Sequence, residues 1–174
     1  AYAGLGEVYW RLYELQKRPE LVALAQDNCR KAIGLNDLLA PVHVTLGMIH
    51  RGTGKAQEAL ADLQRALDRD PRSAEALREK GRAHAALGQT KEAEKAFRDA
   101  LDLRSSDWAT HNFLGALLLA EGRLAEAEAE FRRVIVLTPD NPRGHTNASA
   151  VCFRQGCREE AEALFPRSLK IRPP

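Results

Sequence analysis

The stretch TGKAQEALADLQRAL, residues 53–67, recurs in type as LGQTKEAEKAFRDAL, residues 87–101, and as EGRLAEAEAEFRRVI, residues 121–135. Each copy carries an early glycine, a central alanine and a large apolar residue four positions after that alanine. Self-similarity at a fixed period of about 34 residues is typical of a repeat protein, in which each repeat is one small unit of secondary structure.

The repeat extends outward from these stretches to residues 40–73, 74–107, 108–141 and 142–174. We call a residue's place within its repeat its column. Four columns define the pattern: the eighth (Gly47, Gly81, Gly115, Ser149), the fifteenth (Gly54, Gly88, Gly122, Gly156), the twentieth (Ala59, Ala93, Ala127, Ala161) and the twenty-fourth (Leu63, Phe97, Phe131, Phe165).

Each column has a physical role in a helical hairpin. A glycine at column fifteen can take the left-handed conformation that ends a helix. Small residues at columns eight and twenty let two antiparallel helices approach, and the residue at column twenty-four fills the space beside them. Proline at column thirty-two, as in Pro71 and Pro139, ends the second helix. The sequence therefore predicts an all-α fold of tandem helix–turn–helix units.

Residues 1–39 are predicted to form a stretched first copy. Leu5, Gly6 and Tyr9 match columns seven, eight and eleven, and Ala25 matches column twenty, with seven residues inserted between. Because seven residues are close to two helical turns, we expect each arm to gain one turn. The predicted helices span residues 2–17 and 20–34, with Pro19 in the first turn of the second.

These columns resemble those of the tetratricopeptide repeat family over essentially the whole chain. The resemblance implies one domain, residues 1–174, folded as a right-handed α-solenoid of about five hairpins and ten helices. It also implies a non-catalytic scaffold that binds a segment of a partner protein in a concave groove. The carboxylate clamp of chaperone-binding members is matched only in part, because Phe113 replaces its central asparagine.

The groove would be lined by one face of each first helix. The candidate residues on that face are Trp10, Thr45, Met48, Arg78, Arg82, Asn112, Phe113, Arg143, Asn147 and Arg154. Since arginine binds carboxylates through two parallel hydrogen bonds, we expect an extended ligand with acidic groups and an apolar anchor. The alternative is that Arg78 and Arg82 are solvated and pair with Glu75 and Glu79.

Composition narrows the class of partner. The 26 Lys and Arg residues nearly balance the 24 Asp and Glu residues, which favours neither nucleic acid nor an anionic membrane. No apolar run reaches the roughly 20 residues of a membrane span. The three cysteines form no CxxC pair, which predicts a reducing compartment, the cytoplasm. An excess of Arg over Lys, with abundant Ala and Leu, indicates a bacterial source.

No catalytic motif is present. RGTGK, residues 51–55, lacks the spacing of a phosphate-binding loop, so we interpret Gly54 as a hairpin turn. The five histidines fall in columns four and eleven, where packing residues are expected, and we predict no metal and no cofactor. Two other functions stay open: self-association, for example a homodimer through the terminal hairpins, and a regulatory role within a larger enzyme such as a bacterial kinase or glycosyltransferase.

Overall fold

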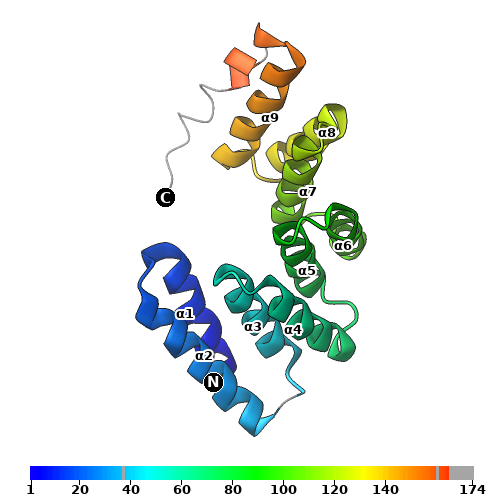
Figure 1. Ribbon diagram of the computed structural model, residues 1–174. Coiled ribbons are helices and arrows are strands. Elements are labelled where there is room, and N and C mark those ends of the chain that lie inside the picture. Colours follow the sequence, from blue (N-terminus) through cyan, green and yellow to red (C-terminus); the bar gives the residue numbers. More distant parts are fainter. Residues whose placement is uncertain (37, 160, 165–174) are drawn as a thin grey trace. The chain divides into compact units, whose positions relative to one another are not determined.

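The computed structural model describes residues 1–36, 38–159 and 161–164, which contain nine complete helices, a further helical segment after them and no strand (Figure 1). The helices are α1 (Tyr2–Gln16), α2 (Pro19–Leu35), α3 (Ala40–Gly52), α4 (Ala56–Arg69), α5 (Ala74–Ala86), α6 (Thr90–Leu103), α7 (Trp108–Ala120), α8 (Leu124–Leu137) and α9 (Pro142–Gln155). The predicted all-α fold of tandem hairpins is confirmed.

The chain divides into two compact units, Ala1–Leu103 and Arg104–Pro174, which we call the N-unit and the C-unit. In the N-unit, α1 and α2, α3 and α4, and α5 and α6 pack as three hairpins, and each hairpin contacts the next. In the C-unit, α7 and α8 form a hairpin on which α9 packs. The grouping of residues 1–174 into a single domain stays a prediction.

The hairpin turns follow the predicted glycines. Gly54, Gly88, Gly122 and Gly156 have φ between 71° and 85°, the left-handed region that favours glycine. The α1–α2 turn reaches the same region through Lys17, at φ 55°, where the sequence has no glycine. The turn at Lys17 therefore could not be found from the glycine pattern.

The first hairpin is longer than the second, and its helix ends lie close to those expected. Its arms have 15 and 17 residues, against 13 and 14 in the hairpin of α3 and α4, so the expected gain of one full turn in each arm is wrong. Pro19 lies in the first turn of α2, as predicted. Proline is tolerated there because the first amide groups of a helix have no partner within it.

Close contact within each hairpin depends on the small residue at column eight. A Cβ atom added to Gly81 would lie 2.6 Å from the Phe97 ring, and one added to Gly115 would lie 2.7 Å from the Phe131 ring. Both rings are buried. The glycine and the aromatic residue at column twenty-four therefore form a matched pair, as the sequence predicted.

We expect Gly81→Ala to destabilise the N-unit by about 1–3 kcal/mol, because the methyl group overpacks the Phe97 ring. Gly4→Ala is the matched control, since a Cβ atom at that helical position meets no other heavy atom within 4 Å. That control should be neutral or gain up to about 1 kcal/mol from helix propensity. Urea unfolding measures both, and equal effects of the two substitutions would contradict the packing.

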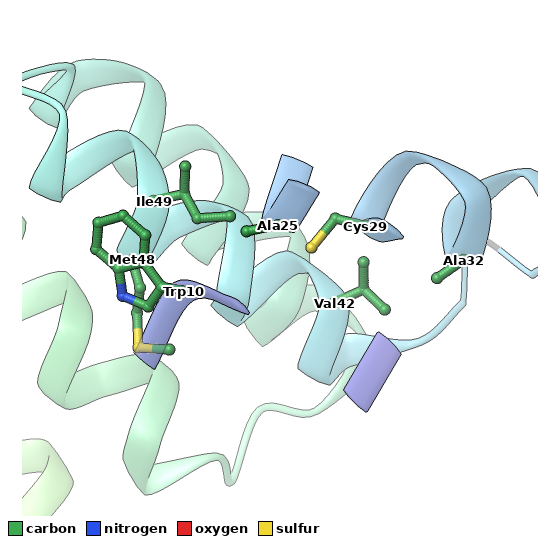
Figure 2. Close-up of a cluster of buried hydrophobic side chains, with 7 residues drawn as sticks. All are labelled: Trp10, Ala25, Cys29, Ala32, Val42, Met48 and Ile49. Atoms are coloured by element: carbon green, nitrogen blue, oxygen red, sulfur yellow. The ribbon is translucent and has the colours of Figure 1, made fainter. Parts of the chain in front are cut away.

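Successive hairpins pack through a fixed set of columns. Columns three and ten of α3, Val42 and Ile49, join a buried cluster with Trp10, Ala25, Cys29, Ala32 and Met48, which we call the Trp10 cluster (Figure 2). The same columns of α5, Ala76 and Ala83, join a second cluster with residues of α3 and α4. Columns three and ten of a first helix therefore face the preceding hairpin.

The C-unit continues past α9. Residues 158–159 and 161–164 are helical, at the place where the tenth helix is predicted to begin. Ala161, at column twenty, is buried, and its carbonyl accepts a hydrogen bond from the Ser149 hydroxyl at 2.9 Å. The remaining pattern residues, Phe165 among them, lie outside the described residues.

Candidate binding surface

The structure corrects the placement of Trp10. Its side chain is 1% exposed and belongs to the Trp10 cluster, where Figure 2 shows the indole beside Met48. Gly52 of α3 makes this possible, because a Cβ atom there would collide with the indole ring. Trp10 therefore packs the first hairpin against the second and does not stand at the entrance of a groove.

Thr45 and Met48 are also buried, at 3% and 5% exposure. The Thr45 hydroxyl donates a hydrogen bond to the Pro41 carbonyl at 3.1 Å, within its own helix. Neither side chain presents a surface to a ligand, because both are buried. We therefore leave Trp10, Thr45 and Met48 out of the candidate surface.

Arg78 and Arg82 lie on α5 beside a buried carboxylate, Glu79, which is 1% exposed. Arg82 donates to both Glu79 oxygens, at 2.8 and 3.0 Å, and Arg78 Nε lies 3.5 Å from Glu79 Oε1. Arg51 of α3 approaches the same carboxylate at 3.3 Å. We call Arg51, Arg78 and Arg82 the arginine cluster; its members are largely buried and paired, not freely solvated.

Three carboxylates surround the arginine cluster. Burial lowers the pKa of the Arg51 guanidinium, and the nearby Arg82 charge lowers it further, although Glu79 and Glu14 oppose this. The third carboxylate, Glu75, contacts Arg78 at 3.2 Å and is 39% exposed. The Glu75 side of the cluster therefore borders solvent, where a guanidinium can bond an anionic group.

The candidates of the C-unit lie on α7 and α9. The side-chain amide nitrogen of Asn147 donates to the side-chain oxygen Oδ1 of Asn112 at 2.8 Å, so these two side chains bond to each other. Arg154 donates to the Leu119 carbonyl at 2.9 Å and remains exposed. Arg143 is exposed and Phe113 is half-buried. Of the C-unit candidates, Arg143 and Arg154 offer the most surface to a ligand.

The histidines at column four have the packing role that the sequence predicts. His43, His111 and His145 are all buried. In the C-unit, His111 Nε2 lies 3.0 Å from the Ser105 carbonyl and His145 Nε2 lies 3.0 Å from the Pro139 carbonyl. Each ring thus fastens the start of a first helix to the segment six residues before it.

His111 should make the stability of the C-unit depend on pH. Burial opposes the charged ring, but hydrogen bonds to Glu130, at 2.6 Å, and to Ser105 outweigh it and raise the pKa of His111. A raised pKa in the folded state adds stability that is complete below the unfolded value of about 6.5 and is lost as pH rises through the folded value.

The measurement is the difference in unfolding free energy between the wild type and His111→Gln from acid to neutral and weakly basic pH. We expect this difference to shrink as pH rises above the unfolded value. A difference that is independent of pH would show that the charged ring contributes nothing.

Glu79 was expected only in the alternative, as a partner of the arginines, and the structure shows that pairing; Arg51 was not among the candidate site residues. Glu79 occupies column six, and Arg51 occupies column twelve of the preceding repeat. The sequence signal for Glu79 is an acidic residue at column six, between arginines at columns five and nine, on a face of the first helix that is expected to be accessible. The burial of Glu79 could not be predicted from the sequence, because it depends on the approach of α3 to α5.

Within the described part of the chain, no group of three or more His, Cys, Asp or Glu side chains is placed to hold a metal ion. The cysteines are free thiols, and burial, with a smaller effect of the Asp62 charge, raises the pKa of Cys29 to about 11. A thiol of that kind is unreactive and serves packing. Among the same residues, no helix is long and apolar enough to cross a membrane.

Tandem hairpins that pack through the same columns, with small residues at their closest contacts, define a helical repeat protein. The chain belongs to the tetratricopeptide repeat family, whose sequence model matches residues 44–107, 80–142 and 114–174. Repeats of this family generally mediate contacts between proteins and are typically non-catalytic. No curated protein matches the sequence.

Solved structures share the fold. A thermophilic tetratricopeptide protein of Thermus thermophilus, TTC0263, is 20% identical with a TM-score of 0.82, over 99% of this chain and 92% of that one. Pseudomonas aeruginosa pilF is 17% identical with a TM-score of 0.82, over 99% and 79%. A MamA crystal structure is 20% identical with a TM-score of 0.76, over 87% and 88%. At these identities the likeness concerns the fold alone.

Proposed function

We propose that this chain is a non-catalytic interaction scaffold that binds an acidic segment of a partner protein on the first-helix face of the N-unit. The arginine cluster carries this proposal. It holds three guanidinium groups around one buried carboxylate, at positions 15–24% exposed. A ligand carboxylate would meet donors that are already fixed in place, which reduces the ordering cost of binding.

Glu79 sets the geometry of this site. Glu79 is hydrogen-bonded or ion-paired with all three arginines, so it fixes the orientation of their guanidinium planes before a ligand binds. The Glu75 side chain is 39% exposed and pairs with Arg78, and Arg11 of α1 lies 3.8 Å from it. A ligand carboxylate can replace Glu75 at Arg78 at little cost, since exposed ion pairs contribute about 1 kcal/mol or less.

The test uses peptides selected from a random library on the immobilised wild-type chain. We expect the selected peptides to be enriched in Asp and Glu. Arg82→Gln should weaken their binding about tenfold or more, because hydrogen bonds between charged groups contribute about 1.5–3 kcal/mol. Fluorescence polarisation of a labelled selected peptide gives the affinities.

Arg98→Gln is the matched control. Arg98 is ion-paired with Glu94 at 2.7 Å, as Arg82 is with Glu79, but it lies on the second helix α6. Its substitution should leave affinity unchanged. Selected peptides without acidic residues, or an Arg82→Gln variant that binds like the wild type, would refute the proposed site.

We propose the cytoplasm of a bacterium as the compartment in which the chain works. Its cysteines are free thiols, and Cys157 is exposed. An exposed unpaired thiol is compatible with a reducing environment. Measuring the oligomeric state with and without a reductant would reveal whether Cys157 forms a disulfide between two copies, which would count against a reducing compartment.

A further inference from the structure

Helix α1 presents an apolar stripe to solvent. Leu5, Val8 and Leu15 are exposed, and Leu12 between them is half-buried. Their spacing of three or four residues places these side chains on one face of the helix. The opposite face is the one that buries Gly6 and Trp10.

One position of this stripe, column ten, is buried in other first helices. Val8 stands at column ten and is 53% exposed, whereas Ile49 of α3, Ala83 of α5 and Val151 of α9 stand at the same column and are fully buried. Ile49 and Ala83 are buried against the preceding hairpin. The stripe on α1 therefore has the form of a surface that packs on a hairpin.

The C-unit carries an apolar pocket of about 870 Å³ along α9 and the helical residues after it. Its lining includes Thr146, Ala150, Phe153 and Ala161, and Phe153 is 66% exposed. Thr146 and Ala161 stand at columns five and twenty. In the N-unit those columns are Val44 and Ala59, which receive Ala76 and Ala83 of the next first helix. The pocket thus corresponds to the receiving surface of a hairpin.

We propose that the pocket of one copy binds the α1 stripe of a second copy, so that copies associate head to tail. The contact would repeat the packing that α3 and α5 already make on their preceding hairpins. The two surfaces of this contact share no residue with the arginine cluster, so each proposal has its own test. Because the two surfaces differ, the contact is heterologous and can continue into chains or close into rings.

Two single substitutions test this contact. Val8→Glu places a charge in the α1 stripe and leaves the pocket intact, and Phe153→Glu places a charge in the pocket and leaves the stripe intact. Both positions are more than half exposed, so each variant should keep its fold, which circular dichroism checks. Val136→Glu is the control, since Val136 is equally exposed on α8 and belongs to neither surface.

Sedimentation velocity over a wide range of concentration gives the result. The wild type and Val136→Glu should associate beyond the 19.3 kDa monomer, and each single variant should associate at least about tenfold more weakly. A mixture of Val8→Glu and Phe153→Glu should form a one-to-one dimer. The intact stripe of the Phe153→Glu variant binds the intact pocket of the Val8→Glu variant, and the two substituted surfaces cannot extend the assembly.

Two results would overturn the proposal. The first is a wild-type chain that stays monomeric at every concentration. The second is a mixture that associates no better than its components, which would show that like surfaces meet.

Discussion

Glu79→Ala should lower the unfolding free energy of the N-unit by about 3 kcal/mol or more. Removing one partner of a buried ion pair leaves uncompensated charge in a medium that solvates it poorly. Here one carboxylate at 1% exposure serves Arg51, Arg78 and Arg82, so its loss leaves three guanidinium groups crowded together. Urea unfolding followed by Trp10 fluorescence, in a Trp108→Phe background, measures the effect.

Glu75→Ala is the control for this prediction. Glu75 lies on the same helix and also pairs with Arg78, but it is 39% exposed. Its removal should cost at most about 1 kcal/mol. Equal losses of unfolding free energy for the two substitutions would show that the burial of Glu79 does not increase its contribution to stability. A gain in stability on losing Glu79 would show that the network destabilises the fold.

Phe131→Ala should destabilise the C-unit by about 3–5 kcal/mol. Phe131 is fully buried against Gly115, and deleting its ring loses transfer free energy and leaves a cavity beside a residue that has no side chain to fill it. Unfolding followed by Trp108 fluorescence, in a Trp10→Phe background, isolates the C-unit. Hydrogen exchange along α7, α8 and α9 should rise together.

Phe153→Ala is the matched control, because it removes the same ring from an exposed position of the same unit. At a concentration where the chain is monomeric, its effect should stay within about 0.5 kcal/mol. A loss at Phe131 no larger than that at Phe153 would contradict the hairpin packing.

The sequence was sufficient for the fold because its strongest constraints are local and repeated. Gly88 must follow a first helix, and Phe97 must face a residue without a side chain, so period and residue size alone predict the hairpins. The Lys17 turn escaped this reasoning, since a lysine there shows no preference for the left-handed region that it occupies.

The candidate surface was predicted less well, because column position does not determine burial. Columns five and nine hold Arg78 and Arg82 in one repeat and Val44 and Met48 in another, and the second pair is buried. The charged heads of Arg78 and Arg82 keep 15% and 24% of their side-chain surface exposed, whereas the apolar side chains of Val44 and Met48 are buried. Glu79 became the centre of the site only because α3 brings Arg51 to it.

The central claim is that the arginine cluster receives a carboxylate of a partner segment. The most direct measurement is the NMR signal of each arginine Nε–H group as a selected acidic peptide is added. We predict that the signals of Arg51, Arg78 and Arg82 shift together and saturate, while those of Arg98 on α6 and Arg123 at the start of α8 stay unchanged. Shifts confined to arginines outside the cluster would contradict the claim.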